Sequence, residues 1–74
     1  MILATGNVRF TTTGGPVVTY PVDAAGIETS FGVLVYDPVE DIYVRGSIAI
    51  RILDATHFVA TRDGVPYAGT YVHV

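Results

Sequence analysis

The sequence has no cysteine, no lysine and no tryptophan, and it contains few charged residues of either sign. Without cysteine the chain forms neither disulfides nor a cysteine-based zinc site, which are two common ways of stabilising a very short protein. A chain of 74 residues makes one domain and buries only about 60% of the surface that its unfolded form exposes. We therefore expect a single domain over residues 1–74, whose small core is supplemented by a protein partner.

Long hydrophobic runs are also absent. No apolar stretch approaches the roughly 20 residues of a membrane-spanning helix, and residues 1–7 lack the basic region and apolar run of a signal peptide. We therefore expect no association with a membrane. The charged fraction of 15% is low, but half of the residues are apolar, which excludes a disordered chain.

The residues that are abundant favour strands. Val, Thr and Ile fill 27 of the 74 positions, whereas Ala, Leu, Glu, Lys, Gln, Arg and Met together fill 17. Short alternating segments separated by Gly and Pro turns are typical of small β proteins. The sequence predicts an all-β fold, a small single-domain antiparallel barrel or sandwich of about six short strands, and spacing does not decide between the two architectures.

The alternation of apolar and polar residues places these strands along the chain. We predict strands at 7–13, 17–20, 31–36, 42–53, 56–61 and from 65 toward 74, with a loop over 22–30. Asp63-Gly64 is typical of a two-residue type I′ hairpin turn, which sets Phe58 opposite Gly69 and Ala60 opposite Tyr67. Pro21 and Pro66 indicate positions where a strand has no neighbour on one side.

The segment 42–53 is unusually long for so small a domain. Twelve residues in a strand span about 40 Å, whereas a compact domain of this size is roughly 30 Å across. The strand must therefore bend, with Gly46 as the natural place, or extend beyond the core. We expect its even positions to face the core, namely Ile42, Val44, Gly46, Ile48, Ile50 and Ile52.

Both faces of the predicted hairpin 31–53 are apolar. Pairing through the loop 37–41 sets Leu34 opposite Val44, and one domain of this size has a single core to offer. Burying roughly four large side chains on the other face contributes about 6–12 kcal/mol, comparable to the stability of a whole domain. The sequence leaves open which face is internal, and it predicts a protein interface made of Phe31, Val33, Val35, Tyr43, Arg45 and Arg51.

The missing lysines bear on strand edges. Soluble β proteins commonly guard exposed edge strands with lysine, so unguarded edges favour pairing with another chain. A GC-rich genome, which disfavours lysine codons, is an equally good explanation of the same absence.

No catalytic, cofactor or metal site is predicted. The acidic loop 37–41 matches calcium motifs poorly and is interpreted as a solvated turn, although the sequence leaves open whether it binds a cation. His57 and His73 are the only histidines and Ser30 and Ser47 the only serines, and no hydrolase or metalloprotease motif surrounds them. We expect a protein that is not an enzyme, with no small-molecule substrate.

In composition the chain is similar to small all-β cement, decoration or minor structural proteins of phage particles, being short, cysteine-free and rich in Val, Thr and Gly. We therefore expect an assembly protein that binds larger subunits or self-associates, located in a virion on this interpretation and otherwise in the cytoplasm. An alternative is a β-module that inhibits or adapts a host protein through Tyr43, Arg45 and Arg51. A third is a small nucleic-acid-binding barrel, which a net charge of −3 disfavours because such proteins normally present a basic face.

Overall fold

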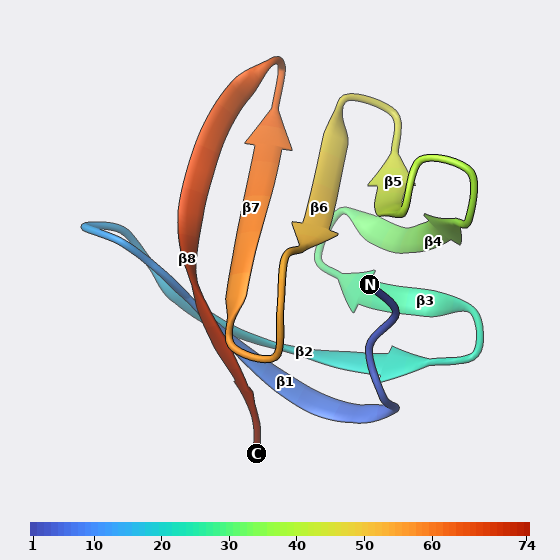
Figure 1. The fold of residues 1–74 in the computed structure, drawn as a ribbon, viewed down its shortest axis with the longest axis horizontal. Helices are drawn as coiled ribbons and strands as arrows, with labels where there is room; N and C mark the ends of the chain where they lie inside the picture. Colours follow the sequence, from blue (N-terminus) through green and yellow to red (C-terminus); the bar gives the residue numbers. More distant parts are fainter.

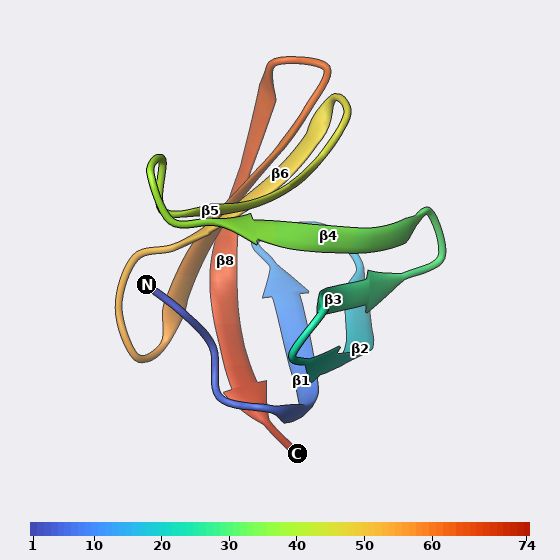
Figure 2. The same ribbon diagram turned by 90° about the vertical axis from the view of Figure 1, so that its right-hand side faces the viewer.

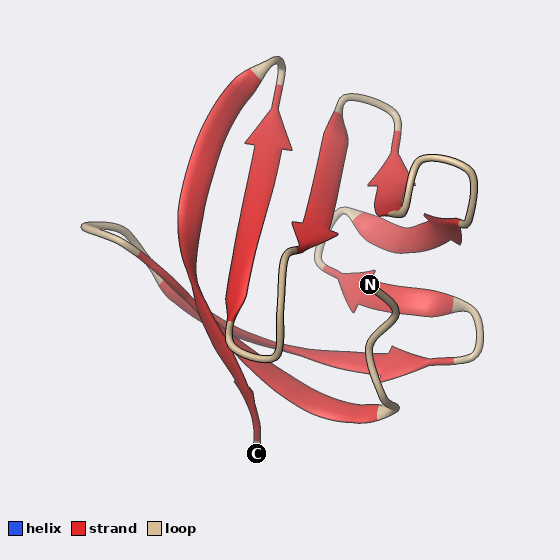
Figure 3. Ribbon diagram, in the orientation of Figure 1, coloured by secondary structure: helices blue, strands red, loops and turns tan.

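The alternating β-branched residues form strands that pair antiparallel in chain order and close on themselves (Figure 1). The computed structural model describes residues 1–74 as a closed barrel of eight strands without a helix (Figure 3). The strands are β1 (Gly6–Thr12), β2 (Val17–Asp23), β3 (Gly26–Thr29), β4 (Gly32–Asp37), β5 (Ile42–Arg45), β6 (Ile48–Ile52), β7 (His57–Arg62) and β8 (Val65–His73). The all-β prediction is confirmed, and the architecture is a barrel. The chain contains no helix that could span a membrane.

Two strands more than predicted arise from two sharp turns. Residues 22–30, predicted as a loop, instead complete β2 and form β3, and Asp23 Oδ1 accepts a hydrogen bond from the Ala25 amide at 2.9 Å in the turn between them. The predicted strand 42–53 is a hairpin, β5 and β6, because Gly46 adopts a left-handed φ of 57° and reverses the chain. The segment 42–53 therefore fits within the small domain because the chain reverses direction at Gly46, not because one long strand bends there.

The pairing of β4 with β5 differs by one residue from the prediction. Tyr36 pairs with Tyr43, and Val35 pairs with Val44. The shift occurs because Asp41 has a left-handed φ of 56°, which lets the turn close between the paired residues Asp37 and Ile42. A shift of one residue moves every side chain of a strand to the opposite face, so the expected inward facing of even positions is wrong in β5 and right in β6.

The β7–β8 hairpin forms as predicted. Asp63 and Gly64 have φ values of 53° and 80°, as a type I′ turn requires. Phe58 pairs with Gly69 and Ala60 with Tyr67.

The inward side chains fill one end and the middle of the barrel. Phe10 and Phe58 meet edge to face with ring centroids 5.1 Å apart, and Tyr36 and Tyr43 lie at the same separation. The buried core consists of Leu3, Val8, Phe10, Val22, Ile27, Leu34, Tyr43, Ile50, Ile52, Phe58 and Tyr71.

The two ends of the barrel differ. The segment before β1 covers one end, where Leu3 is only 7% exposed and its amide donates to Tyr43 Oη at 2.8 Å. His73 Nε2 lies 2.9 Å from the Ala4 carbonyl oxygen at the same end. Figure 2 shows this segment on the side opposite the β3–β4 turn. The end near that turn has no such cover.

Closure changes the expectation about strand edges. Every strand pairs with two neighbours, so the barrel has no free edge strand. A strand from another protein therefore cannot pair along the full length of any strand of the barrel. Several short stretches extend past their ladders, among them Val17–Pro21 of β2 on the β3 side, Gly32–Leu34 of β4 on the β5 side and Val65–Tyr67 of β8 on the β1 side. Pro21 and Pro66 lie in the stretches of β2 and β8, where the missing N–H costs no ladder bond.

Gly69→Ala tests the closure. A Cβ at Gly69 would lie 2.0 Å from the Thr11 carbonyl oxygen and 2.9 Å from Phe58 Cε1, so β1 and β8 must move apart. We expect the free energy of unfolding, measured by urea titration, to fall by about 3 kcal/mol or more. Thr70→Ala, at the neighbouring outward position, should change it by less than about 0.5 kcal/mol; equal effects of the two substitutions would contradict this packing.

Candidate protein interface on the barrel wall

The outward side chains of β4 to β8 form a continuous apolar surface. Successive cross-strand partners link Val35 to Val44, Val44 to Ala49, and Ala49 to Thr61. A second row links Arg51 to Val59 and Val59 to Ala68. We call this surface the outer apolar face and define it by Val33, Val35, Ile42, Val44, Ala49, Leu53, Val59 and Ala68.

The outer apolar face follows from the strand pattern. The inward positions of these strands belong to the core and to the barrel interior, so the outward side chains of the same strands have no core to enter. Val35 is 56% exposed and Leu53 is 53% exposed, and between them Ile42, Val44, Ala49 and Val59 are only half-buried. A contiguous apolar surface of this kind indicates an interaction site.

Arg51 is the charged side chain in the middle of this surface, and Asp37, the partner of Ile42, lies at its border. Arg51 lines a hollow of about 280 Å³ together with Ile42, Ala49, Leu53, Val59 and Thr61. Its Nη2 donates to the Glu40 carbonyl oxygen at 3.2 Å, and Arg51 forms no ion pair with a carboxylate. An arginine surrounded by apolar side chains is typical of the energetic centres of protein interfaces.

The structure brings together three of the six predicted interface residues. Val33, Val35 and Arg51 lie on the outside of the barrel, whereas Tyr43 is inside and 2% exposed. Placing Tyr43 on the same face as Val33 and Val35 is wrong because of the one-residue shift between β4 and β5.

The other two predicted residues, Phe31 and Arg45, lie at the uncovered end of the barrel. Phe31 is 51% exposed in the β3–β4 turn, and Arg45 ends β5 with its guanidinium against Gly32. The prediction also omitted six residues of the outer apolar face: Ile42, Val44, Ala49, Leu53, Val59 and Ala68. Alternation within each strand could have found them, had the phase of β5 been known.

The carboxylates of the loop 37–41 serve the loop itself. Asp37 Oδ1 accepts hydrogen bonds from the amides of Val39 at 2.9 Å and Glu40 at 3.4 Å. Asp41 pairs with the amino group of Met1 and accepts from Tyr36 Oη, and these contacts hold its pKa below the usual value. No cluster of three or more His, Cys, Asp or Glu side chains that could hold a metal ion is found.

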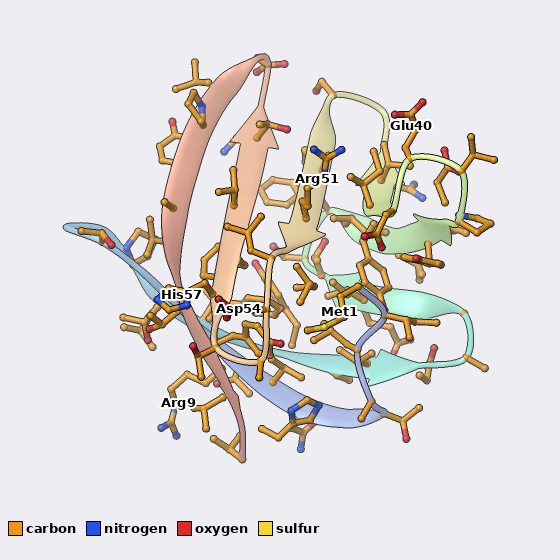
Figure 4. All side chains as sticks on the ribbon, in the orientation of Figure 1. Met1, Arg9, Glu40, Arg51, Asp54 and His57 are labelled. Carbon is orange, nitrogen blue, oxygen red and sulfur yellow. The ribbon has the colours of Figure 1, made fainter.

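Asp54 organises the turn between β6 and β7. Its Oδ1 accepts from the amides of Thr56 and His57, each at 2.8 Å, and both carboxylate oxygens lie 3.0 Å from His57 Nδ1 (Figure 4). The Asp54 carbonyl oxygen also accepts from Tyr71 Oη at 2.5 Å. Neither serine is near, because Ser30 is in the β3–β4 turn and Ser47, in the β5–β6 turn, accepts from Asp63 at the far end of β7.

No protein-family model, curated protein or solved structure matches this chain. Small barrels carry many unrelated functions, so the fold by itself assigns none. The features that distinguish this barrel are its outer apolar face and its one uncovered end.

Tyr43→Ala tests the interior position of this residue. Losing the ring opens a cavity and leaves the Leu3 amide without its acceptor, so we expect the free energy of unfolding to fall by about 3–5 kcal/mol. Arg45→Ala, at an exposed position, should change it by less than about 0.5 kcal/mol. Urea titration followed by circular dichroism measures both, and a Tyr43→Ala protein as stable as the wild type would place this ring outside the core.

Asp54 predicts a pH dependence of stability. The Thr56 amide and the His57 side chain lower the pKa of its carboxyl to about 2, whereas the unfolded value is about 3.9. Because the folded pKa is depressed, the stabilisation is fully present above about pH 4 and is lost as pH falls through the folded value. Asp54→Asn should therefore be less stable than the wild type at neutral pH, with a difference that shrinks toward pH 2. Urea titrations across this range check it, and a constant difference would contradict the assignment.

Proposed function

We propose that the protein is a non-enzymatic assembly protein that binds larger protein subunits, or copies of itself, through the outer apolar face. The observation that carries the proposal is the outer apolar face itself, which two overlapping cross-strand rows, one over β4 to β7 and one over β6 to β8, form on the outside of a closed barrel. Only 15% of the residues are charged. The outer apolar face therefore carries little of the charge whose repulsion keeps ordinary domains apart.

A stable interface would take up a substantial part of this small surface. A standard interface removes about 800 Å² from each partner, close to one fifth of the 4401 Å² that this protein exposes. The partner would cover the side chains of β4 to β8 and pack against them directly, since the closed barrel offers no complete strand edge for pairing. Arg51 would anchor the contact by pairing with an acidic group of the partner.

A virion is the setting that we propose for this assembly. The support is compositional, because small all-β cement, decoration and minor structural proteins of phage particles are similarly short, cysteine-free and poor in charge. In such a particle the barrel would cover and hold the larger subunits beneath it.

An inhibitor or adaptor of a host protein is the second candidate, and Arg51 within its apolar surround would serve that function equally well. The two functions predict different native species. An assembly protein is found in a multimeric particle, whereas an adaptor is a monomer that binds a single partner. Nucleic-acid binding is disfavoured because the arginines are dispersed, with Arg9 on β1, Arg51 on the wall and the remaining two near the uncovered end.

Light scattering on Val35→Lys with Val44→Lys tests the proposal. Both residues face outward, so the double variant should fold, and two buried ammonium groups should weaken association by about 3 kcal/mol or more. We expect the wild type to form assemblies, alone or with the particle that it copurifies with, and the double variant to remain a monomer.

Val17→Lys with Thr19→Lys is the matched control, because these outward positions of β2 lie off the outer apolar face. It should assemble like the wild type. A wild type that stays monomeric and binds one host protein in a one-to-one complex would support the adaptor, and unimpaired assembly of the Val35/Val44 variant would overturn the interface.

A further inference from the structure

The uncovered end of the barrel leads into an apolar cavity. Its volume is about 250 Å³, and Phe10, Leu34, Ile50 and Phe58 form its inner part. The entrance, which we call the mouth, is lined by Thr12, Val18, Thr29, Phe31, Ile48, Arg62 and Tyr67. The cavity exists because the covering segment with Leu3 fills only the opposite end.

The dimensions suit a small molecule. A dry cavity of about 150 Å³ is enough to bind benzene, so this one accommodates an aromatic ring with a short chain or a medium-length acyl chain. Eight-stranded barrels are just wide enough to hold one small ligand, and ligands commonly enter at the mouth of the barrel.

Two of the four arginines of the chain lie at this end of the barrel. Arg62 lines the mouth, and Arg45 lies beside it with its guanidinium against Gly32. Arg45 pairs with Ile48 across β5 and β6, and Ile48 pairs with Arg62 across β6 and β7. The two cations therefore flank Ile48 in one cross-strand row, at positions that share the inward side of the barrel with Ile50.

Each guanidinium group packs against a neighbour that accepts no hydrogen bond from it, so its N–H donors have no partner in the protein. Arg62 lies over the Phe31 ring, with its guanidinium carbon 5.0 Å from the ring centroid. Arg45 lies against Gly32, where a Cβ would come within 2.6 Å of its guanidinium carbon. Neither arginine forms an ion pair, and Arg51 is the only arginine whose side chain hydrogen-bonds to the protein.

We infer that the mouth binds a small apolar carboxylic acid, with its hydrocarbon part in the cavity and its carboxylate at Arg45 and Arg62. A guanidinium presents parallel N–H donors that match the two oxygens of a carboxylate. The apolar cavity beneath supplies the affinity for the hydrocarbon part and excludes ligands that are charged at both ends. This site is separate from the outer apolar face and goes beyond the proposed function.

Titration of the isotope-labelled protein with octanoate, followed by amide NMR, tests the inference. Octanol is the matched uncharged ligand. We expect saturable shifts at mouth residues such as Phe31, Ile48 and Tyr67, and affinity for octanoate at least tenfold higher than for octanol. Equal affinities, shifts centred on the outer apolar face, or no saturation with octanoate at millimolar concentration would overturn the site.

Substitutions distinguish the contribution of the arginine charges to ligand binding from that of the cavity shape. Arg62→Gln and Arg45→Gln should each weaken octanoate binding tenfold or more while leaving octanol binding unchanged, and Arg9→Gln on β1 is the control arginine that should alter neither. Ala60→Leu narrows the cavity and should abolish binding of both ligands, with circular dichroism checking that the barrel is intact. Octanoate affinity that survives both mouth substitutions would overturn the carboxylate assignment. The Val35/Val44 lysine variant should keep octanoate binding, so the two proposals fail independently.

Discussion

The pairing of β1 with β8 is the constraint on which the rest of the structure depends. It joins Phe10 to Tyr71 and Thr12 to Gly69, and it turns a meander of eight strands into a surface with one inside and one outside. Before closure, the side chains on either side of a strand could be buried in a core. After closure, the apolar side chains on the outside can be buried only by another molecule.

Much of the local structure could be predicted, because local turn chemistry determines it. Asp63-Gly64 favours a single turn type, and the register of β7 and β8 follows from it. The β4–β5 register could not be obtained in this way, because it depends on Asp41 entering the left-handed region, which aspartate tolerates but does not require. Gly46 was recognisable as the place where the chain changes direction, although composition does not distinguish a bend from a reversal.

The interface was predicted in part for the same reason. Val33, Val35 and Arg51 belong to strands whose alternation was correctly read, so they lie outside as a group. Tyr43 was misplaced because a shift of one residue in the β4–β5 register moves its ring from the outside of the barrel to the core. The mouth was not predicted, since Phe31 and Arg62, which line it, are distant in sequence and come together only in the folded sheet.

The β1–β8 ladder also has a kinetic consequence. Val8 pairs with His73, so closure depends on contacts between residues near opposite ends of the sequence, and proteins dominated by such contacts fold slowly. Seven of the eight strand pairs are hairpins that form locally, but none of them alone shields the apolar side chains. Until β8 has docked on β1, the nascent chain exposes its future core as well as its outer wall. The period of greatest susceptibility to aggregation therefore lasts until the final strand has been synthesised.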